Sequence, residues 1–227
     1  MPRRRSERAK EREVTRERAR AEVTFDFLTE TQKAAWEAYQ QNDVLFLAGP
    51  AGTGKTFLAM AFAIRDILKK QRQRIILTRP IVEAGESLGY LPGDFTEKVN
   101  PYMIPLYDCY HTLCPGATLK NKVIEQAFEV APIAYMRGRT FNNSVCIFDE
   151  AQNATMSQLK LFLTRFGQNS KIIITGDPLQ SDLRDRSGLS TVIDKLHDLE
   201  GVGIVKFSQA DVVRHPLVSS ILERFEQ

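Results

Sequence analysis

Glycines, a lysine and a threonine gather at residues 49–56, directly after an apolar run at 44–47. The segment fits the pattern G-x-x-x-x-G-K-[ST] in full. Glycines permit the tight turn whose N–H groups surround a phosphate, the lysine places a cation on the outer phosphates, and the threonine hydroxyl is a ligand for Mg²⁺. The residues expected to hold the nucleotide are Gly49, Pro50, Ala51, Gly52, Thr53, Gly54, Lys55, Thr56 and Phe57, with Lys55 also catalytic.

The other interpretation of this segment is a glycine-rich turn with an unrelated lysine. An apolar run before it and a helical pattern after it favour the phosphate loop, because the positive end of a helix then points at the same anion. The motif predicts nucleotide binding and says little about what the nucleotide is used for.

Two carboxylates, Asp149 and Glu150, follow a second apolar run at 145–148. Ligands of parallel sheets sit at the carboxyl ends of the strands, so both acids are expected to reach the phosphate site. We expect Asp149 to hold Mg²⁺ through a water, together with Thr56, and Glu150 to orient or deprotonate the attacking water. The second acid favours hydrolysis over simple binding.

A third strand end carries Asp177 and Gln180, in the segment Gly-Asp-Pro-Leu-Gln that follows the apolar run at 172–175. A short acid and an amide at this point are suited to sensing the γ-phosphate and coupling its loss to movement. The alternative is an ordinary turn, which Gly-Asp-Pro forms readily.

The elements that must position these residues alternate along the chain. Continuous apolar strands alternating with helices indicate an α/β fold with a mostly parallel sheet covered on both faces. The expected strands are 44–47, 75–78, 132–135, 145–148, 172–175 and 204–207, and the expected helices are 29–41, 55–70, 97–111, 118–129, 156–166, 188–198 and 216–225.

The chain of 227 residues carries a net charge of +3, and its composition is that of a globular protein. Residues 1–22 hold nine basic and five acidic side chains, while the other 205 residues hold 22 basic and 23 acidic ones. We therefore expect a basic arm over 1–24 and one domain over 25–227. Three cysteines are too few for a disulfide framework, and neither a signal peptide nor a membrane span is evident, which predicts a soluble cytoplasmic protein without membrane contact.

The order of these motifs resembles the first RecA-like domain of superfamily 1 helicases. The segments 78–94, 132–140 and 211–217 resemble signatures of the PhoH family of ATPases, so the resemblance covers about residues 25–225. It implies a P-loop NTPase with a RecA-like three-layer fold that hydrolyses ATP with Mg²⁺. Relatives with an added nuclease-like domain are associated with RNA unwinding, which extends the expectation to an RNA helicase-like activity.

The resemblance also assigns residues outside the three motifs. Gln32 matches a glutamine that reads the adenine edge, although it could equally be an exposed polar residue of helix 29–41. Arg214 matches the arginine that reaches the γ-phosphate across an interface, and Arg165 is a second candidate for this nucleotide contact. The alternative for Arg214 is an ordinary surface arginine.

Three arginines, Arg79, Arg137 and Arg139, fall near aromatic residues in loops that we expect after strand ends. Arginines on phosphates with aromatics stacked on bases is the pattern of single-strand binding. The alternative for Arg137 and Arg139 is a subunit interface or the phosphate site itself. Because the body is nearly neutral, any nucleic-acid surface must be local or recruit the arm.

About 45 residues follow Gln180, too few for the second RecA-like domain of a superfamily 1 helicase. An arginine from a neighbouring subunit would complete the site, so we expect a homo-oligomer, most simply a hexameric ring. The leading function is an ATPase that acts on or is stimulated by single-stranded nucleic acid, RNA before DNA. The alternatives are a nucleotide-dependent assembly module and a small-molecule P-loop kinase.

Overall fold

The computed structural model describes residues 26–80, 104, 107–113, 126–180, 188–213, 217, 218, 221 and 224. The basic arm over 1–24, most of the segment 78–94, and Arg214 lie outside these described residues. The helix expected at 216–225 is described at only four positions, all helical.

Six parallel strands form one sheet in the order β3-β2-β4-β5-β1-β6. The strands are β1 (Val44–Ala48), β2 (Arg74–Thr78), β3 (Phe128–Val130), β4 (Ser144–Phe148), β5 (Lys171–Gly176) and β6 (Val202–Lys206). This arrangement confirms the expected α/β fold with a parallel sheet. Since all strands run the same way, the loops that follow β1, β2, β4 and β5 meet at one edge.

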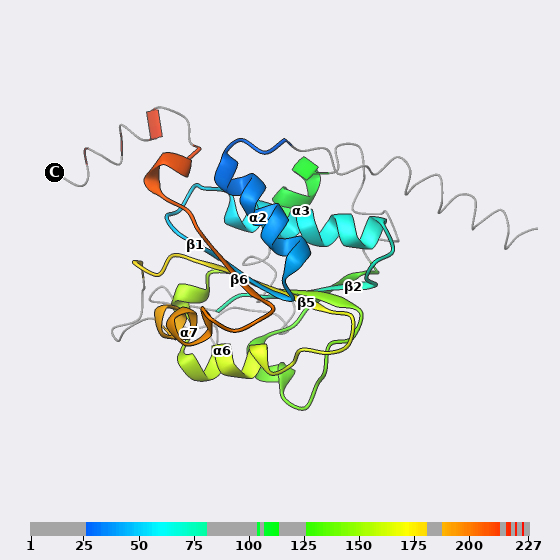
Figure 1. Ribbon diagram of the computed structural model, residues 1–227. Coiled ribbons are helices and arrows are strands. Elements are labelled where there is room, and N and C mark those ends of the chain that lie inside the picture. The colour runs from blue at the N-terminus through cyan, green and yellow to red at the C-terminus, as the bar shows by residue number, and fades with distance from the viewer. Residues whose placement is uncertain are drawn as a thin grey trace, which may run out of the picture.

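Helices cover both faces of this sheet, as Figure 1 shows. One face carries α2 (Glu30–Gln41) and α3 (Lys55–Leu68), and the other carries α6 (Met156–Leu163), α7 (Gly188–Leu196) and the short 3₁₀ helix η2 (Ile133–Met136). Two further 3₁₀ turns, η3 (Ala151–Asn153) and η4 (Gln209–Asp211), follow strand ends. Residues 107–113 are also helical.

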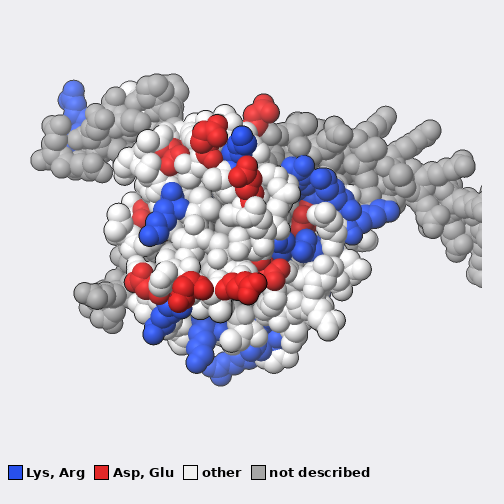
Figure 2. All heavy atoms as spheres, viewed as in Figure 1, with Lys and Arg blue, Asp and Glu red and all other residues white. Residues whose placement is uncertain are grey.

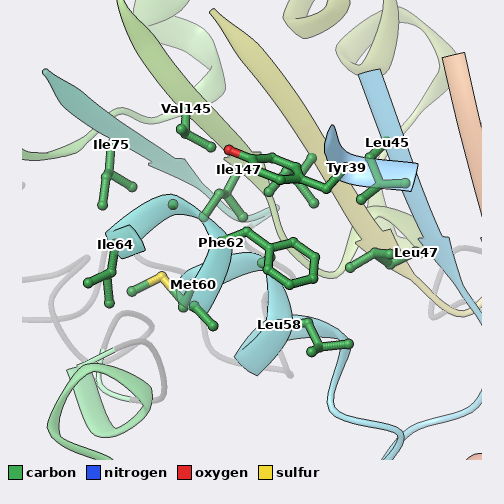
Figure 3. Close-up of a cluster of buried hydrophobic side chains, with 14 of the residues drawn as sticks. Tyr39, Leu45, Leu47, Leu58, Met60, Phe62, Ile64, Ile75, Val145 and Ile147 are labelled. Atoms are coloured by element: carbon green, nitrogen blue, oxygen red, sulfur yellow. The ribbon is translucent and has the colours of Figure 1, made fainter. Parts of the chain in front are cut away.

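Alternating strand side chains build a separate apolar core on each face. Leu45 and Leu47 of β1 point toward α3, and Phe46 points to the opposite face. Phe62 of α3 packs against Tyr39 of α2, with ring centroids 5.1 Å apart, in the same cluster as Leu47 of β1 and Ile147 of β4 (Figure 3). Burying a side chain of this size contributes about 2–3 kcal/mol relative to leaving it exposed.

Local sequence signals account for where the helices begin. The Thr29 side chain accepts a hydrogen bond from the Gln32 N–H, which caps α2. Thr155 and Gln158 form a capping box that starts α6. Gly54, in the left-handed region at φ 84°, leads directly into α3.

One expected strand is wrong. Residues 133–136 form η2, and the edge strand β3 lies earlier, at 128–130, overlapping the end of the helix expected at 118–129. Pro132 has no N–H to donate to a neighbouring strand. Ile133 and Met136 are buried at a spacing of three while Tyr135 is exposed, which is a helical pattern and not an alternating one.

Candidate nucleotide site

The phosphate loop leaves the end of β1, between the neighbouring strands β5 and β6. Gly49, Gly52 and Gly54 all have positive φ, at 146°, 88° and 84°. A side chain at Gly49 would overlap the backbone carbonyl and Cβ of Phe207. The loop therefore needs glycine at these positions for backbone conformation, and at Gly49 for space as well.

Lys55 and Thr56, at the start of α3, lie at the pocket. Lys55 Nζ donates to the Pro50 carbonyl of the same loop at 2.7 Å. Thr56 Oγ1 donates to Asp149 Oδ1 at 2.7 Å, although 93 residues separate the two in the chain. The sequence motifs that follow β1 and β4 are thus in direct contact, although β5 lies between these two strands in the sheet.

Asp149 is buried and sits between two hydroxyls. Its Oδ1 accepts hydrogen bonds from Thr56 and from Thr175 at the end of β5. Hydroxyl and carboxylate oxygens are the hard donors that Mg²⁺ prefers, and Mg²⁺ sites in such proteins use few protein ligands and several waters. The Thr56 hydroxyl and the Asp149 carboxylate therefore fit Mg²⁺.

Glu150 follows Asp149 in the left-handed conformation at φ 54°, which is uncommon for a residue with a side chain. This conformation costs about 1–2 kcal/mol and is tolerated where surrounding contacts fix it. Its carboxylate accepts from Arg79 at 3.3 Å and from Gln152 at 2.5 Å. Gln152 in turn accepts from the Asp177 N–H at 3.1 Å. Hydrogen bonds through Glu150 and Gln152 thus connect the segments that follow β2, β4 and β5.

Asp149, Glu150 and Gln152 line one cavity of about 280 Å³. The cavity is lined by the phosphate loop, by the two acids that follow β4, and by Asp177 and Gln180, the two candidate site residues that follow β5. Asp177 Oδ1 accepts from the Leu179 N–H at 3.0 Å, which holds the turn that presents Gln180. The structure thus brings together the three motifs that the sequence placed at three separate strand ends.

Gln32 is buried against the phosphate loop, so its interpretation as an exposed polar residue is wrong. Its amide nitrogen donates to the Thr53 carbonyl at 3.2 Å, and its oxygen accepts from the Leu28 N–H at 2.8 Å. The segment after β6 closes the other side of the loop, because the Val213 N–H donates to the Gly52 carbonyl at 3.0 Å. Arg214, the next residue, lies outside the described part of the chain.

The structure does not bring Arg165 to the pocket. Arg165 follows the C-terminal end of α6 and donates to the carbonyls of Leu161 and Arg139, both at 3.2 Å. Helix α6 starts near the end of β4 and runs back toward the start of β5, which separates Arg165 from the phosphate loop of its own subunit.

The three arginines considered for nucleic acid follow different elements. Arg79 follows the end of β2 beside the pocket, as expected. Arg137 and Arg139 do not follow a strand end, because the expected strand at 132–135 is η2, and both precede β4. Arg139 forms an ion pair with Glu129 and lies over the Phe141 ring, 4.8 Å from its centroid.

Sequence reasoning gave no role to three residues of the site: Gln152, Thr175 and Cys109. Gln152 and Thr175 lie next to the motifs at 149–150 and 176–180, and this closeness in the sequence was the signal that could have predicted their part in the site. Cys109 lines the cavity from the helical segment 107–113, and nothing in its neighbourhood predicted that contact. The pKa of the Cys109 thiol is raised to about 11, mainly by burial and to a smaller extent by the negative charges of Asp149 and Asp108.

Comparison with known proteins agrees with this geometry. The family model described as PhoH-like protein matches residues 25–226. The chain belongs to the PhoH-like protein family. It is 50% identical over 198 residues to a PhoH-like protein of Synechocystis sp. and 50% identical over 193 residues to one of Bacillus subtilis.

These PhoH-like relatives are longer than this chain. The alignments cover 86% and 84% of this chain and 60% of each relative, and an alignment with Protein PhoH of Escherichia coli K12, at 42% identity, covers 86% and 56%. The chain thus spans about 60% of the length of these relatives.

A solved structure, the large terminase of a thermophilic bacteriophage, has the same fold. It superimposes with a TM-score of 0.54 at 13% identity, covering 88% of this chain and 50% of the terminase. The resemblance to the PhoH family and the expected P-loop fold are therefore confirmed. Among the described residues, no helix is long and apolar enough to cross a membrane.

Proposed function

We propose that this PhoH-like chain hydrolyses ATP with Mg²⁺ and that single-stranded nucleic acid, RNA before DNA, stimulates the reaction. The observation that carries the proposal is the position of Glu150 at the cavity, beside the hydrogen-bonded pair Thr56–Asp149. A nucleotide-binding site alone needs the loop and the metal ligands. A second carboxylate at the same cavity supplies what hydrolysis adds, a base or orienting group for water.

In the proposed reaction, a water oxygen attacks the γ-phosphorus while the bond from that phosphorus to the bridging oxygen of ADP breaks. Glu150 orients this water and accepts its proton, and Lys55 and the loop N–H groups stabilise the phosphate charge. Mg²⁺, when bound at Thr56 and Asp149, would neutralise charge on the β- and γ-phosphates. In this proposal Asp177 and Gln180, which line the same cavity, sense the departing phosphate.

The nucleic-acid surface in this proposal is local. On the face of the molecule drawn in Figure 2, acidic side chains of the described residues lie between the basic ones, so the basic side chains form no continuous surface there. An extended positive surface is the usual footprint of broad phosphate binding. Arg79, at the end of β2 and next to Glu150, is the arginine whose position best fits contact with a nucleic-acid strand near the ATP site.

The test measures ATP hydrolysis with Mg²⁺, alone and with single-stranded RNA or DNA of one length. Glu150→Gln should lower kcat about 100-fold or more, because it removes the general base. Lys55→Ala should lower kcat/KM by about 100-fold or more through lost phosphate stabilisation. The control is Glu200→Gln, an exposed glutamate in the turn before β6, which should leave both constants unchanged.

Three results would contradict the proposal. Full turnover by Glu150→Gln would remove Glu150 from the reaction. Hydrolysis that neither RNA nor DNA alters would favour an assembly module, and transfer of the phosphate to a metabolite would favour a kinase.

We also propose that the active form is a ring of identical chains, most simply a hexamer, in which Arg214 reaches the ATP of a neighbour. Exposed apolar side chains support an interface in the C-terminal region, namely Val213, Leu217, Val218 and Ile221. Head-to-tail contacts between identical chains close into rings when the rotation allows.

A further inference from the structure

The carboxylate of Glu150 is held on both of its oxygens. Oε1 accepts from the Arg79 guanidinium at 3.3 Å, and Oε2 accepts from the Gln152 amide at 2.5 Å. A base that acts on water must turn a lone pair toward that water. A carboxylate fixed by a partner on each oxygen has little freedom to do so, and release of one partner restores this freedom.

The two partners of Glu150 differ in how firmly they are built into the fold. Gln152 is buried, and its other amide atom accepts from the Asp177 N–H, so both ends of this side chain are used. A side chain at Gly176 would overlap the Gln152 oxygen, which shows how closely the end of β5 packs on it. Gln152 is therefore the fixed partner of Glu150.

Arg79 is the exchangeable partner. Its side chain is 25% exposed and that of Glu150 is 36% exposed, so solvent reaches the ion pair. Within the described residues, Glu150 is the one acidic group that pairs with Arg79. Partly exposed ion pairs are weak, and a guanidinium binds a phosphate as readily as a carboxylate, so an external phosphate can replace Glu150 as its partner.

The sheet places Arg79 where such a phosphate can act on the reaction. Strands β2 and β4 are paired from Arg74–Ser144 to Thr78–Phe148, and the Asp149 N–H donates to the Thr78 carbonyl at 2.9 Å. Arg79 and Glu150 thus follow adjacent strand ends whose backbones are hydrogen-bonded. Movement of the Arg79 side chain changes the contacts of Glu150 without any change in the sheet.

We propose that Arg79 is a positioning residue that holds Glu150 away from the attacking water, and that a backbone phosphate of single-stranded nucleic acid draws Arg79 off and thereby starts hydrolysis. This inference rests on the proposed function and names how that site is regulated. In the absence of nucleic acid the ion pair keeps turnover low. With nucleic acid bound, Gln152 alone retains the carboxylate at the cavity, and the freed oxygen faces the water.

The experiment compares steady-state ATP hydrolysis by the full chain and by Arg79→Gln, without nucleic acid and with poly(U). Without nucleic acid, Arg79→Gln should raise kcat by about threefold or more and leave KM for ATP within about twofold, since Arg79 acts through Glu150 and not on the nucleotide. Poly(U) should then add little to the rate of the variant. A purely structural role would instead lower kcat together with the unfolding temperature.

Matched variants isolate the ion pair. Arg79→Lys keeps the positive charge and should keep both the low basal rate and the stimulation. Arg74→Gln removes an arginine at the other end of β2, paired with Glu129 at 3.6 Å, and should behave as the wild type. The double variant Arg79→Gln/Glu150→Gln should lose the raised kcat, because the increase depends on Glu150 acting as the base. Arg79→Ala serves as a second neutral variant if Arg79→Gln does not fold.

A basal kcat of Arg79→Gln at or below that of the wild type overturns this inference, whatever poly(U) does. If the wild type hydrolyses ATP with Glu150 dependence and the variant is unchanged, the regulation is wrong and the proposed ATPase stands. If poly(U) does not stimulate the wild type but Arg79→Gln is faster, the restraint is supported and nucleic acid is not its ligand. If neither protein hydrolyses ATP, both proposals fail.

Discussion

At the scale of single residues, Gly49 shows how the phosphate loop depends on a missing side chain. Its φ of 146° disfavours other residues, and a Cβ there would overlap the backbone of Phe207 after β6. Neither Gly49 nor Phe207 can shift cheaply, because the Phe207 N–H donates to the Ala48 carbonyl at 2.7 Å. The loop and the end of β6 are therefore locked together at this point.

We predict that Gly49→Ala lowers the free energy of unfolding by about 3 kcal/mol, from backbone strain and steric overlap together. The matched control is Gly138→Ala, where φ is 74° but nothing lies within 4 Å of the added Cβ. That control should cost only about 1 kcal/mol, from the left-handed backbone alone. Urea unfolding of both variants measures the difference. Equal losses would show that the overlap with Phe207 is relieved without cost.

The residues that could be predicted from the sequence are those whose chemistry is encoded by local spacing. The phosphate loop, Asp149 and Glu150 each stand in a short motif at a strand end. Gln152 and Thr175 could not be given roles, since their partners are set by which strands are neighbours. The Arg79–Glu150 pair joins residues 71 positions apart and depends on β2 lying beside β4, an order that periodicity does not reveal.

At the scale of elements, Asp211 fastens the segment after β6 to the start of α2. Its carboxylate accepts from the Ser208 N–H at 2.8 Å and from the Ser208 hydroxyl at 3.0 Å. The Ser208 backbone bond, followed by the hydroxyl of Thr31, lowers the pKa of Asp211 below its ordinary value of 3.8. The same short helix α2 carries Gln32 to the phosphate loop, so this contact supports the nucleotide site indirectly.

We predict that Asp211→Asn destabilises the fold by about 1–2 kcal/mol at pH 7, because charge-assisted hydrogen bonds to a buried carboxylate are lost. Since the folded-state pKa is depressed, the stability from Asp211 is present above pH 3.8 and is lost as the pH falls through the folded-state value. Urea unfolding at pH 7 and at about pH 3 should therefore show a smaller difference at the lower pH. Asp194→Asn, at an exposed position of α7, is the control and should change stability by less than about 0.5 kcal/mol. An Asp211→Asn loss that does not shrink in acid would assign the effect to packing.

The edge of the sheet shows where element prediction from sequence stops. Five of the six expected strands carry continuous apolar runs of four residues or nearly so, and the structure contains them. Strand β3 has three residues, Phe128–Val130, with Glu129 in the middle. Such a short edge strand has one neighbour and little burial, so its pattern is too weak to separate from the helix expected there.

At the scale of the whole molecule, the faces of the sheet stabilise the fold and the carboxyl ends of its strands form the candidate nucleotide site. Its two faces are filled by apolar cores, and the cavity with all three nucleotide motifs lies at the strand ends. Exposed apolar residues are found beyond this arrangement, in the C-terminal region at Leu217, Val218 and Ile221 and in the turn after β5 at Leu179, which is 94% exposed. Contiguous exposed apolar residues mark interaction surfaces more often than chance allows.

We predict that the full chain forms a ring with a mass about six times that of the monomer in the presence of ATP and Mg²⁺, as measured by light scattering. The double variant Leu217→Glu/Ile221→Glu places charges at the proposed interface and should shift the mass toward that of the monomer, because a buried unpaired charge is costly. Leu199→Glu changes a similarly exposed leucine after α7 and should leave the ring intact. Since a ring is needed to deliver Arg214 to a neighbour, the double variant should also lose ATP hydrolysis while its unfolding midpoint stays near that of the wild type. A wild-type chain that remains a monomer with ATP and Mg²⁺ would rule out the ring, and Arg214 would then have to act within its own chain or not at all.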